Sequence, residues 1–413
     1  MERRVVITGL GAITPIGNNT KEFWEGIKKG KCGIDEITLF DASNHKVKLA
    51  AELKEYDPEK YFEKRKAKRL DKYSQYGLIA SKEAWEDSKL DKEKEDMEKV
   101  GVILGSGIGG LETIEKESEK CTQRGPDKVS PMYIPMGISN MAAGNVAIEI
   151  GAKGESIAIV TACATGTHCI GEGFRMIKHG YQDIVLAGGS EAGITPSSMA
   201  GFANIKALSK STDKNRASIP FDKERNGFVM GEGAGMVVLE ELEHAKARGA
   251  KIYAEVVGYS ATSDAYHITS PAPGGEGGAR AMKKAMVEAN IEPKDITYIN
   301  AHGTSTPLND FSETGAVKTA LGEEVAKKVM ISSTKGHIGH LLGAAGGVEA
   351  IVCAKAIEEG FVPATINYKV PDEDCDLDII PNEGRNVEVK YAMSNSLGFG
   401  GHNSSIILKK YEG

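Results

Sequence analysis

Two segments rich in glycine and alanine constrain the fold most, because they indicate helices that glycine would weaken. The run Gly343-Ala344-Ala345-Gly346-Gly347 follows a strand-like Val329–Ser332 and leads into a helix that extends through Lys355. In the first half, the strand-like Ile157–Val160 likewise leads into a helix that starts with small residues. Glycine inside a helix costs about 1 kcal/mol relative to alanine. We therefore expect these helices where they must approach other backbone closely, buried between two sheets.

The rest of the sequence supports two related halves. Strand-like segments head both halves, at Val5–Thr8 and Ile252–Val257. Short apolar strands alternate with helical patterns, as in Val5–Thr8, Thr20–Lys29, Tyr73–Ser88 and Val100–Leu104, which is typical of α/β layers. No Pro/Ser-rich linker divides the chain. We expect one compact unit of two α/β halves, residues 1–250 and 251–413, stacked as alternating sheets and helices.

Composition and charge exclude several classes of protein. Apolar residues make up 40% of the 413 and charged residues 26%, and no apolar run reaches the roughly 18 residues of a membrane span. The net charge of −7 argues against general nucleic-acid binding. The segment from Met1 to Gly9 runs straight into a strand without a signal peptide. The six cysteines show neither paired nor metal-type spacing, so we expect a protein of the reducing cytoplasm.

Cys163 is the leading candidate nucleophile. It lies where the apolar strand Ile157–Val160 breaks into a turn and a helix follows, so it is aimed out of the sheet. The positive end of the helix dipole is expected to lower its pKa. Two Gly-rich segments, around His302 and from Lys335 to His340, add imidazoles. We expect His337 and His340 to lie in a loop because glycines separate them, and the combination suggests acyl-group chemistry at a thioester.

Three other kinds of site can be compared with this one. The run Gly105-Ser106-Gly107-Ile108-Gly109-Gly110 matches a dinucleotide-binding fingerprint, but no acidic residue ends a second strand about 20 residues later. A tight turn beside a buried ligand fits the run better. A metal site of Cys163, His168, Cys169, His337 and His340 lacks zinc-type spacing. A cysteine hydrolase would need a thiolate and a base, but two histidines and a lysine suit stabilisation of an enolate better.

Taken in order along the chain, the motifs resemble those of the β-ketoacyl-acyl-carrier-protein synthases, a family of the thiolase-like superfamily. The similarity runs from Val5 to the C-terminus. It rests on Ala162-Cys163-Ala164-Thr165-Gly166, Pro220-Phe221-Asp222, Gly231-Glu232-Gly233-Ala234-Gly235, Ala301-His302-Gly303-Thr304-Ser305-Thr306, Lys335-Gly336-His337-Ile338-Gly339-His340 and Gly398-Phe399-Gly400-Gly401. The segment Asp264–Pro271 and the residue Ile108 are most similar to the corresponding residues of one branch of this family, synthase II, which elongates long acyl chains. The resemblance implies a duplicated α/β fold in five layers, α-β-α-β-α.

Carbon–carbon bond formation at a thioester needs a carbanion equivalent, which distinguishes two kinds of enzyme in the superfamily. A degradative thiolase forms it with a second cysteine as base near the C-terminus. That region here, Gly398 to His402, contains no cysteine. Loss of CO₂ from a malonyl unit forms the carbanion without a base, so decarboxylating condensation of acyl and malonyl carrier proteins is expected.

The resemblance also implies roles for individual residues. Cys163 takes the acyl chain, His302 and His340 stabilise the enolate, and Lys335 pairs with Glu349. The backbone N–H groups of Cys163 and Phe399 form an oxyanion hole. Phe399 gates the acyl pocket, and Ile108 limits its depth. The residues expected to bind substrate, either the phosphopantetheine arm or the acyl chain, are Thr304, Thr306, Thr269, Ser270 and Ile108.

Partners follow from the same resemblance. No cofactor is required, since phosphopantetheine arrives on the acyl carrier protein. The fold implies a homodimer, in which Tyr133 and Ile134 reach the partner's acyl pocket. Carrier docking falls on basic residues, Arg65, Lys66, Lys68, Arg69, Lys128 and Lys206. A Na⁺ or K⁺ site occurs in some relatives, at positions that match Asn300, Glu349, Ser394 and Asn395. Two rivals remain, a non-catalytic partner subunit, which would lack the active cysteine, and a polyketide ketosynthase.

Overall fold

In a computed structural model, which describes residues 3–413, each half of the chain contributes five strands to one ten-stranded sheet. The first half consists of β1 (Val5–Ile13), α1 (Thr20–Lys28), β2 (Asp35–Glu36), β3 (Leu49–Ala50), α2 (Lys64–Ala67), α3 (Lys72–Ser88), β4 (Val100–Gly105), α4 (Leu111–Arg124), α5 (Tyr133–Gly137), α6 (Met141–Ile150), β5 (Ser156–Ile157), α7 (Thr165–Lys178), β6 (Ile184–Glu191), α8 (Pro196–Asn204), β7 (Gly233–Glu241) and α9 (Leu242–Ala247). The second consists of β8 (Ala254–Ser263), α10 (Glu276–Ala289), β9 (Tyr298–Asn300), α11 (Pro307–Leu321), α12 (Glu323–Ala326), β10 (Met330–Ser332), α13 (Lys335–Ile338), α14 (Ala345–Glu359), β11 (Phe361–Val362), β12 (Arg385–Asn386), β13 (Tyr391–Gly398) and β14 (His402–Lys409).

The duplication is visible in the strand order. Within the first half the strands lie in the order β5-β4-β6-β7-β1, and within the second in the order β10-β9-β13-β14-β8. When only the five strands that each half contributes to the ten-stranded sheet are numbered, each order is third, second, fourth, fifth, first. The fifth strand of each half, β7 or β14, is antiparallel to both of its neighbours, and the other pairs within each half are parallel. The halves meet where β1 pairs with β8, from Val5 opposite Val256 to Ile7 opposite Ala254.

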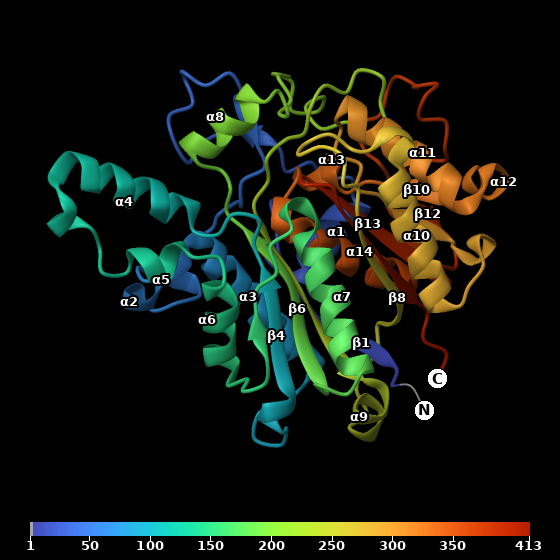
Figure 1. The fold of residues 1–413 in the computed structure, drawn as a ribbon, viewed down its shortest axis with the longest axis horizontal. Helices are drawn as coiled ribbons and strands as arrows, with labels where there is room; N and C mark the ends of the chain where they lie inside the picture. Colours follow the sequence, from blue (N-terminus) through green and yellow to red (C-terminus); the bar gives the residue numbers. More distant parts are fainter. Residues whose placement is uncertain (1–2) are drawn as a thin grey trace.

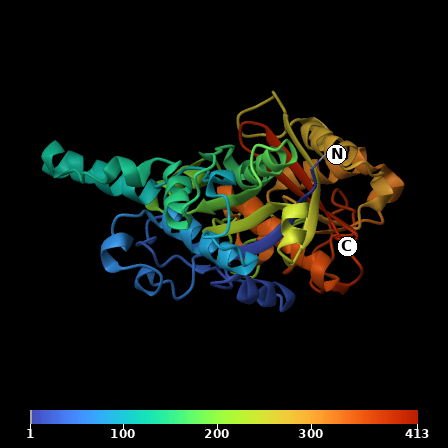
Figure 2. The ribbon, with the colours of Figure 1, turned by 90° about the horizontal axis from the view of Figure 1, so that it is seen from below.

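Helices cover and separate these two sets of strands in five layers (Figures 1 and 2). Helices α3 and α6 pack outside the first half, and α10 and α11 outside the second. Helices α7 and α14 lie between the halves, in contact with each other and with strands of both. Helix α4 projects from this body as an arm in both views. Among the described residues, no helix is long and apolar enough to span a membrane.

The packing of the two central helices, α7 and α14, explains why they contain so many small residues. Every residue of α14 from Ala345 to Ala354 is buried, as expected for a helix enclosed on all sides. A Cβ added to Gly166 of α7 would lie 2.7 Å from the Gly347 nitrogen of α14, and one on Gly347 would lie 2.1 Å from the Gly235 oxygen of β7. The prediction that these helices are buried against other backbone is therefore confirmed.

Some boundaries differ from the sequence prediction. The strand at Val5 continues to Ile13, whereas the strand expected at Ile157–Val160 keeps only Ser156–Ile157. Val160 is 49% exposed and belongs to the approach to the Cys163 turn. The segment from Lys335 to Ile338, expected as a loop, forms one helical turn, α13, which ends at Gly339 with φ +68°. Glycine tolerates this left-handed conformation, so the chain can reverse just before His340.

Candidate active site

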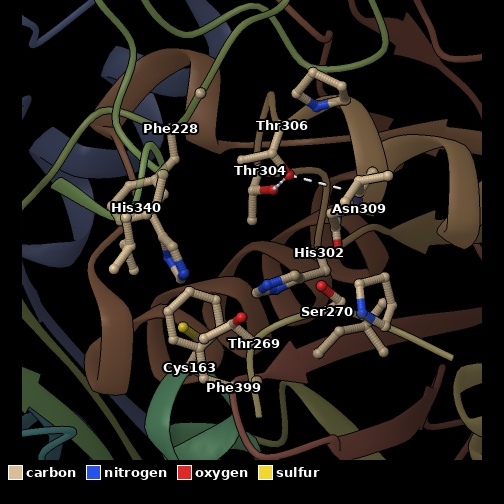
Figure 3. A pocket seen from close by; sticks show the side chains of 18 of the residues that line it. Cys163, Phe228, Thr269, Ser270, His302, Thr304, Thr306, Asn309, His340 and Phe399 are labelled. Carbon is tan, nitrogen blue, oxygen red and sulfur yellow. Dashed lines mark hydrogen bonds between the residues drawn. The ribbon is translucent and has the colours of Figure 1, made fainter. Parts of the chain in front are cut away.

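Cys163 lies in a short 3-10 turn, Ala162–Ala164, that leads directly into α7. The preceding residue, Ala162, has φ +51°, a left-handed conformation rare for a residue with a Cβ. Local strain of this kind occurs at functional sites, where the surrounding structure holds it. The turn presents the sulfur at the floor of a cavity (Figure 3).

The end of strand β13 lies directly against this turn. A Cβ added to Gly398 would lie 2.8 Å from the Thr161 oxygen and 3.2 Å from the Cys163 nitrogen. Only glycine permits this approach, which brings the next residue, Phe399, beside Cys163. The backbone N–H groups of Phe399 and Cys163 both face the sulfur and favour its thiolate form. Two N–H donors at one position are what an oxyanion hole requires.

The expected lowering of the Cys163 pKa is wrong. The residue is 9% exposed, and burial raises the pKa of its thiol to about 12. The charge of Lys335 and the two backbone N–H groups act in the opposite direction but do not outweigh burial. Desolvation disfavours the charged form of any buried thiol. The resting group is therefore a thiol.

His302 and His340 approach each other edge to face, with ring centroids 5.2 Å apart, beside Cys163 (Figure 3). His302 follows β9, and its loop is held by Glu313 of α11, whose carboxylate accepts the backbone N–H of His302 and of Gly303 at 2.8 Å. His340 follows α13. Burial, and secondarily the charge of Lys335, lowers the pKa of both rings well below the ordinary value. Both imidazoles are therefore neutral at physiological pH.

The hydrogen bonds of His340 define which nitrogen carries its proton. The backbone N–H of Leu342 donates to His340 Nδ1 at 3.3 Å, so that Nδ1 is the acceptor and the proton lies on Nε2. Nε2 is buried and has no partner among the described residues. His302 Nδ1 likewise has no partner there. The site therefore holds a donor at His340 Nε2 ready for a substrate oxygen.

Lys335 and His337 share α13 with different surroundings. The Lys335 ammonium pairs with Glu349 of α14, both buried, as the resemblance implies. His337 is turned away from Cys163, since its ring nitrogens contact the backbone oxygens of Lys31 and Ala364 at 3.1 and 3.2 Å. His337 is a core residue. Among the described residues, no group of three or more His, Cys, Asp or Glu side chains could hold a metal ion.

The cavity above Cys163 has a volume of about 360 Å³. Nine of the predicted residues line it: Cys163, Lys206, Thr269, Ser270, His302, Thr304, Thr306, His340 and Phe399. Thr304 and Thr306 are hydrogen-bonded to each other through their hydroxyls at 2.9 Å, and the Thr306 side chain caps α11 at Asn309 (Figure 3). The loops therefore converge as expected from residues far apart in the sequence.

Sequence reasoning missed Phe202 of α8 and Phe228, which also line the cavity. The ring centroids of Phe202 and Phe228 lie 5.6 Å apart. Phe202 also lies 6.3 Å from the Phe399 ring, and Phe228 lies 5.2 Å from the His340 ring, so the two rings connect Phe399 to His340. Neither belongs to a motif. Glu313, which holds the His302 loop, also lacked a signal, because an acidic residue inside a helix is more often solvent-exposed.

Three predicted substrate residues lie outside the cavity. Ile108 packs against the apolar cluster that includes Cys163, Met199 and Leu342, behind the nucleophile. Tyr133 and Ile134 belong to α5, and Ile134 is 59% exposed. The basic residues predicted to dock a carrier are all exposed: Arg65, Lys66, Lys68, Arg69, Lys128 and Lys206. Of these, Lys206 alone also lines the cavity.

The residues predicted to hold a monovalent cation contain unpaired oxygen atoms. Asn300 of β9 is the register partner of Ser394 on β13, and α14, which carries Glu349, packs on both strands. Asn300 Oδ1, Glu349 Oε2 and Ser394 Oγ are buried with no hydrogen-bond partner among the described residues. The Asn395 amide is engaged instead, since its oxygen accepts from Ser405 at 2.7 Å. Three of the four residues fit a hard cation.

The fold and the site define a thiolase-like ketosynthase, and comparisons agree. Family models described as "Beta-ketoacyl synthase, N-terminal domain" and "Beta-ketoacyl synthase, C-terminal domain" match residues 2–245 and 253–369. The chain therefore belongs to the beta-ketoacyl synthase family. It is 52% identical over 410 residues to 3-oxoacyl-[acyl-carrier-protein] synthase 2 of Staphylococcus aureus (strain COL), covering 99% of each. It is 49% identical over 412 residues to the protein of that name from Synechocystis sp., covering 100% of this chain and 99% of the relative.

Two solved structures share the fold over the whole of both chains. One is AntDE:AntF, described as a type II PKS acyl-carrier protein in complex with its ketosynthase bound to the hexaketide, with a TM-score of 0.93 and 36% identity. The other is a beta-ketoacyl synthase from Burkholderia phymatum STM815, with a TM-score of 0.91 and 33% identity.

Proposed function

We propose that the protein condenses acyl carrier protein thioesters with malonyl carrier protein, releasing CO₂, the free carrier and a 3-oxoacyl carrier protein. One observation carries this proposal: Cys163, His302 and His340 face one cavity, with the His340 Nε2 donor unpaired. The similarity to 3-oxoacyl-[acyl-carrier-protein] synthase 2 favours fatty acid elongation over polyketide synthesis.

In the first half-reaction, Cys163 takes the acyl chain. Its sulfur attacks the thioester carbonyl and loses its proton, and the carrier's phosphopantetheine thiol leaves. The N–H groups of Cys163 and Phe399 stabilise the tetrahedral oxyanion, since both already face the sulfur. Thr304 and Thr306 bind the phosphopantetheine arm, with Thr269 and Ser270 on the opposite wall. The acyl chain passes Phe399 toward Ile108 and the apolar cluster behind Cys163.

In the second half-reaction, the malonyl thioester oxygen accepts hydrogen bonds from His340 Nε2 and His302 Nε2. As the C–C bond to the carboxylate breaks, its electron pair forms an enolate that these donors stabilise, and CO₂ leaves. The enolate carbon then attacks the acyl–Cys163 carbonyl, and the thiolate departs. Burial, and secondarily the charge of Lys335, which is held by Glu349, keeps both imidazoles neutral, and a neutral imidazole still carries one N–H donor.

The assembly and the location form part of the same proposal. Exposed apolar side chains on and around α5 and α6, Ile134 at 59%, Ile138 at 43% and Ile148 at 79%, support a homodimer interface there. In such a dimer Tyr133 and Ile134 would serve the partner's cavity rather than their own. The predicted basic residues on and just after α2, with Lys128 and Lys206, dock an acidic carrier, and the oxygens of Asn300, Glu349 and Ser394 hold Na⁺ or K⁺. A cytoplasmic location fits the carrier substrates.

Mass spectrometry of the intact protein tests the condensation. The protein is incubated with a long-chain acyl carrier protein and then with malonyl carrier protein. Acyl mass on Cys163, followed by its loss with CO₂ release and a product two carbons longer, is expected. If Cys163 never acquires acyl mass, the role of a non-catalytic partner subunit replaces this function.

A further inference from the structure

Glu191, the last residue of β6, is a buried carboxylate that the mechanism above does not use. Its Oε1 accepts from the Ser106 hydroxyl at 2.7 Å, and its Oε2 accepts from the backbone N–H of Gly107 at 2.7 Å and of Gly343 at 2.9 Å. A fully buried carboxylate is expensive unless donors satisfy it. Here three donors from two loops that are distant in the sequence satisfy the carboxylate, so both loops are held against it.

The first loop leads to the acyl pocket. Ser106 and Gly107 directly precede Ile108, whose side chain packs in the apolar cluster behind Cys163. The Ser106 hydroxyl also accepts the Gly109 backbone N–H at 2.9 Å. Glu191 therefore holds the start of the turn that carries Ile108 directly, and its far end, Gly109, through the Ser106 hydroxyl.

The second loop leads to the enolate-binding histidine. Gly343 follows Leu342, whose backbone N–H donates to His340 Nδ1. Leu342 has φ +46°, a conformation unfavourable for its branched side chain. The turn therefore needs an external partner, and the bond from Gly343 N–H to Glu191 supplies one immediately after Leu342.

The two loops touch at the carboxylate. A Cβ added to Gly343 would lie 2.3 Å from the Gly107 nitrogen and 2.9 Å from Glu191 Oε2. We propose that Glu191 is a positioning residue that holds the acyl-pocket turn at Ile108 and the His340 turn in one fixed relationship behind Cys163. This inference rests on the proposed roles of Ile108 and His340.

Three substitutions distinguish the effect of the length of the Glu191 side chain from the effect of its charge. Glu191→Asp withdraws the carboxylate by one methylene and cannot hold both loops. A misplacement of about 1 Å can cost about 10²-fold in rate, so both cysteine acylation and CO₂ release from malonyl carrier protein should fall at least about tenfold. Glu191→Gln keeps an oxygen for both backbone N–H groups and turns its amide toward the Ser106 oxygen, so it should retain both half-reactions. Ser106→Ala releases the acyl-pocket turn alone, and should change the dependence of kcat/KM on acyl length while leaving CO₂ release unchanged.

Glu83 of α3, outside the first half, supplies the matched control, because its half-buried carboxylate accepts the backbone N–H groups of Ala12 and Thr20. Glu83→Asp should leave both half-reactions at the wild-type rate. The inference is overturned if Glu191→Asp behaves like the wild type, if Glu191→Gln fails as completely as Glu191→Asp, or if Glu83→Asp lowers both half-reactions equally. If Glu191→Asp does not fold, an unchanged acyl-length profile in Ser106→Ala overturns it. A wild type inactive in both half-reactions contradicts the proposed function instead.

Discussion

Lys335 and Glu349 form an ion pair that is almost closed to solvent, with side chains 2% and 1% exposed. The pair joins α13 to α14 behind His302 and His340. The ammonium charge contributes to the lowered pKa of both His302 and His340. The pair therefore influences the charge state of the two imidazole rings, although it forms no hydrogen bond with either ring.

Replacing Lys335 by methionine should make decarboxylation more sensitive to acid. The charge of Lys335 lowers both imidazole pKa values, so its removal raises them, and the rings become protonated at a higher pH than in the wild type. The acid limb of CO₂ release from malonyl carrier protein, which lies well below pH 6.5 in the wild type, should therefore move upward toward that pH in the variant.

The stability of the same variant offers a second measurement. Glu349 loses its partner, and an unpaired buried charge costs about 3–5 kcal/mol, so the melting temperature should fall. The double variant Lys335→Met with Glu349→Gln should recover stability while keeping the shifted acid limb. If the acid limb of both variants coincides with that of the wild type, Lys335 does not control the histidine charge.

His340→Ala should separate the two half-reactions. Loss of one hydrogen-bond donor to a developing oxyanion costs about 10²–10³ in rate, so CO₂ release should fall by that factor. Acylation of Cys163, which uses backbone N–H groups, should persist in intact-mass measurements. His337→Asn is the control, because His337 contacts Lys31 and Ala364 rather than the cavity. Equal losses of CO₂ release in both variants would argue against a specific role for His340.

Gly398→Ala should impair acylation. The added methyl would lie 2.8 Å from the Thr161 oxygen and 3.2 Å from the Cys163 nitrogen, which forces β13 and the Phe399 N–H away from the sulfur. Acyl transfer, followed by mass spectrometry over time, should slow by about 10²-fold or more. Gly201→Ala, on α8 with no atom within 4 Å of the new methyl, should acylate normally. Normal acylation of Gly398→Ala would remove the Phe399 N–H from the oxyanion hole.

The sequence predicted the duplicated fold and the residues that meet at Cys163, because both depend on local patterns. The small-residue helices α7 and α14 and the loops around His302 and His340 each carry a recognisable signal within a few positions. The boundaries of β1 and β5 were less accurate, since pairing with neighbouring strands decides where a strand ends.

Other features depend on three-dimensional packing, which no local pattern records. Phe202 and Phe228 become part of the site only because their rings meet between Phe399 and His340. The pKa of Cys163 was predicted in the wrong direction, because the position of the residue at a helix start was visible in the sequence whereas its burial was not. Glu191 gave no signal for the same reason, as its three donors come from positions far from it in the chain.

Na⁺ or K⁺ should stabilise the protein if the oxygens of Asn300, Glu349 and Ser394 bind a cation. A ligand present at about 100 times its Kd adds about 2.7 kcal/mol to the free energy of unfolding. The melting temperature should therefore be higher in KCl or NaCl than in choline chloride of equal ionic strength. Ser394→Ala should reduce this difference, because Ser394 Oγ has no other partner among the described residues. Equal melting temperatures in the three salts would contradict a cation site.

The rate of alkylation of Cys163 by iodoacetamide should continue to increase as the pH is raised well above neutrality. Burial raises the thiol pKa to about 12, and only the thiolate reacts, so the rate should rise about tenfold per pH unit with no plateau up to about pH 10. Quantifying the Cys163 peptide by mass spectrometry separates it from Cys121, which is exposed. Lys335→Met should slow the reaction further, because the charge of Lys335 favours the thiolate. A plateau near neutral pH would show that the helix N-terminus and the two backbone N–H groups stabilise a resting thiolate, and that acylation begins without loss of a proton.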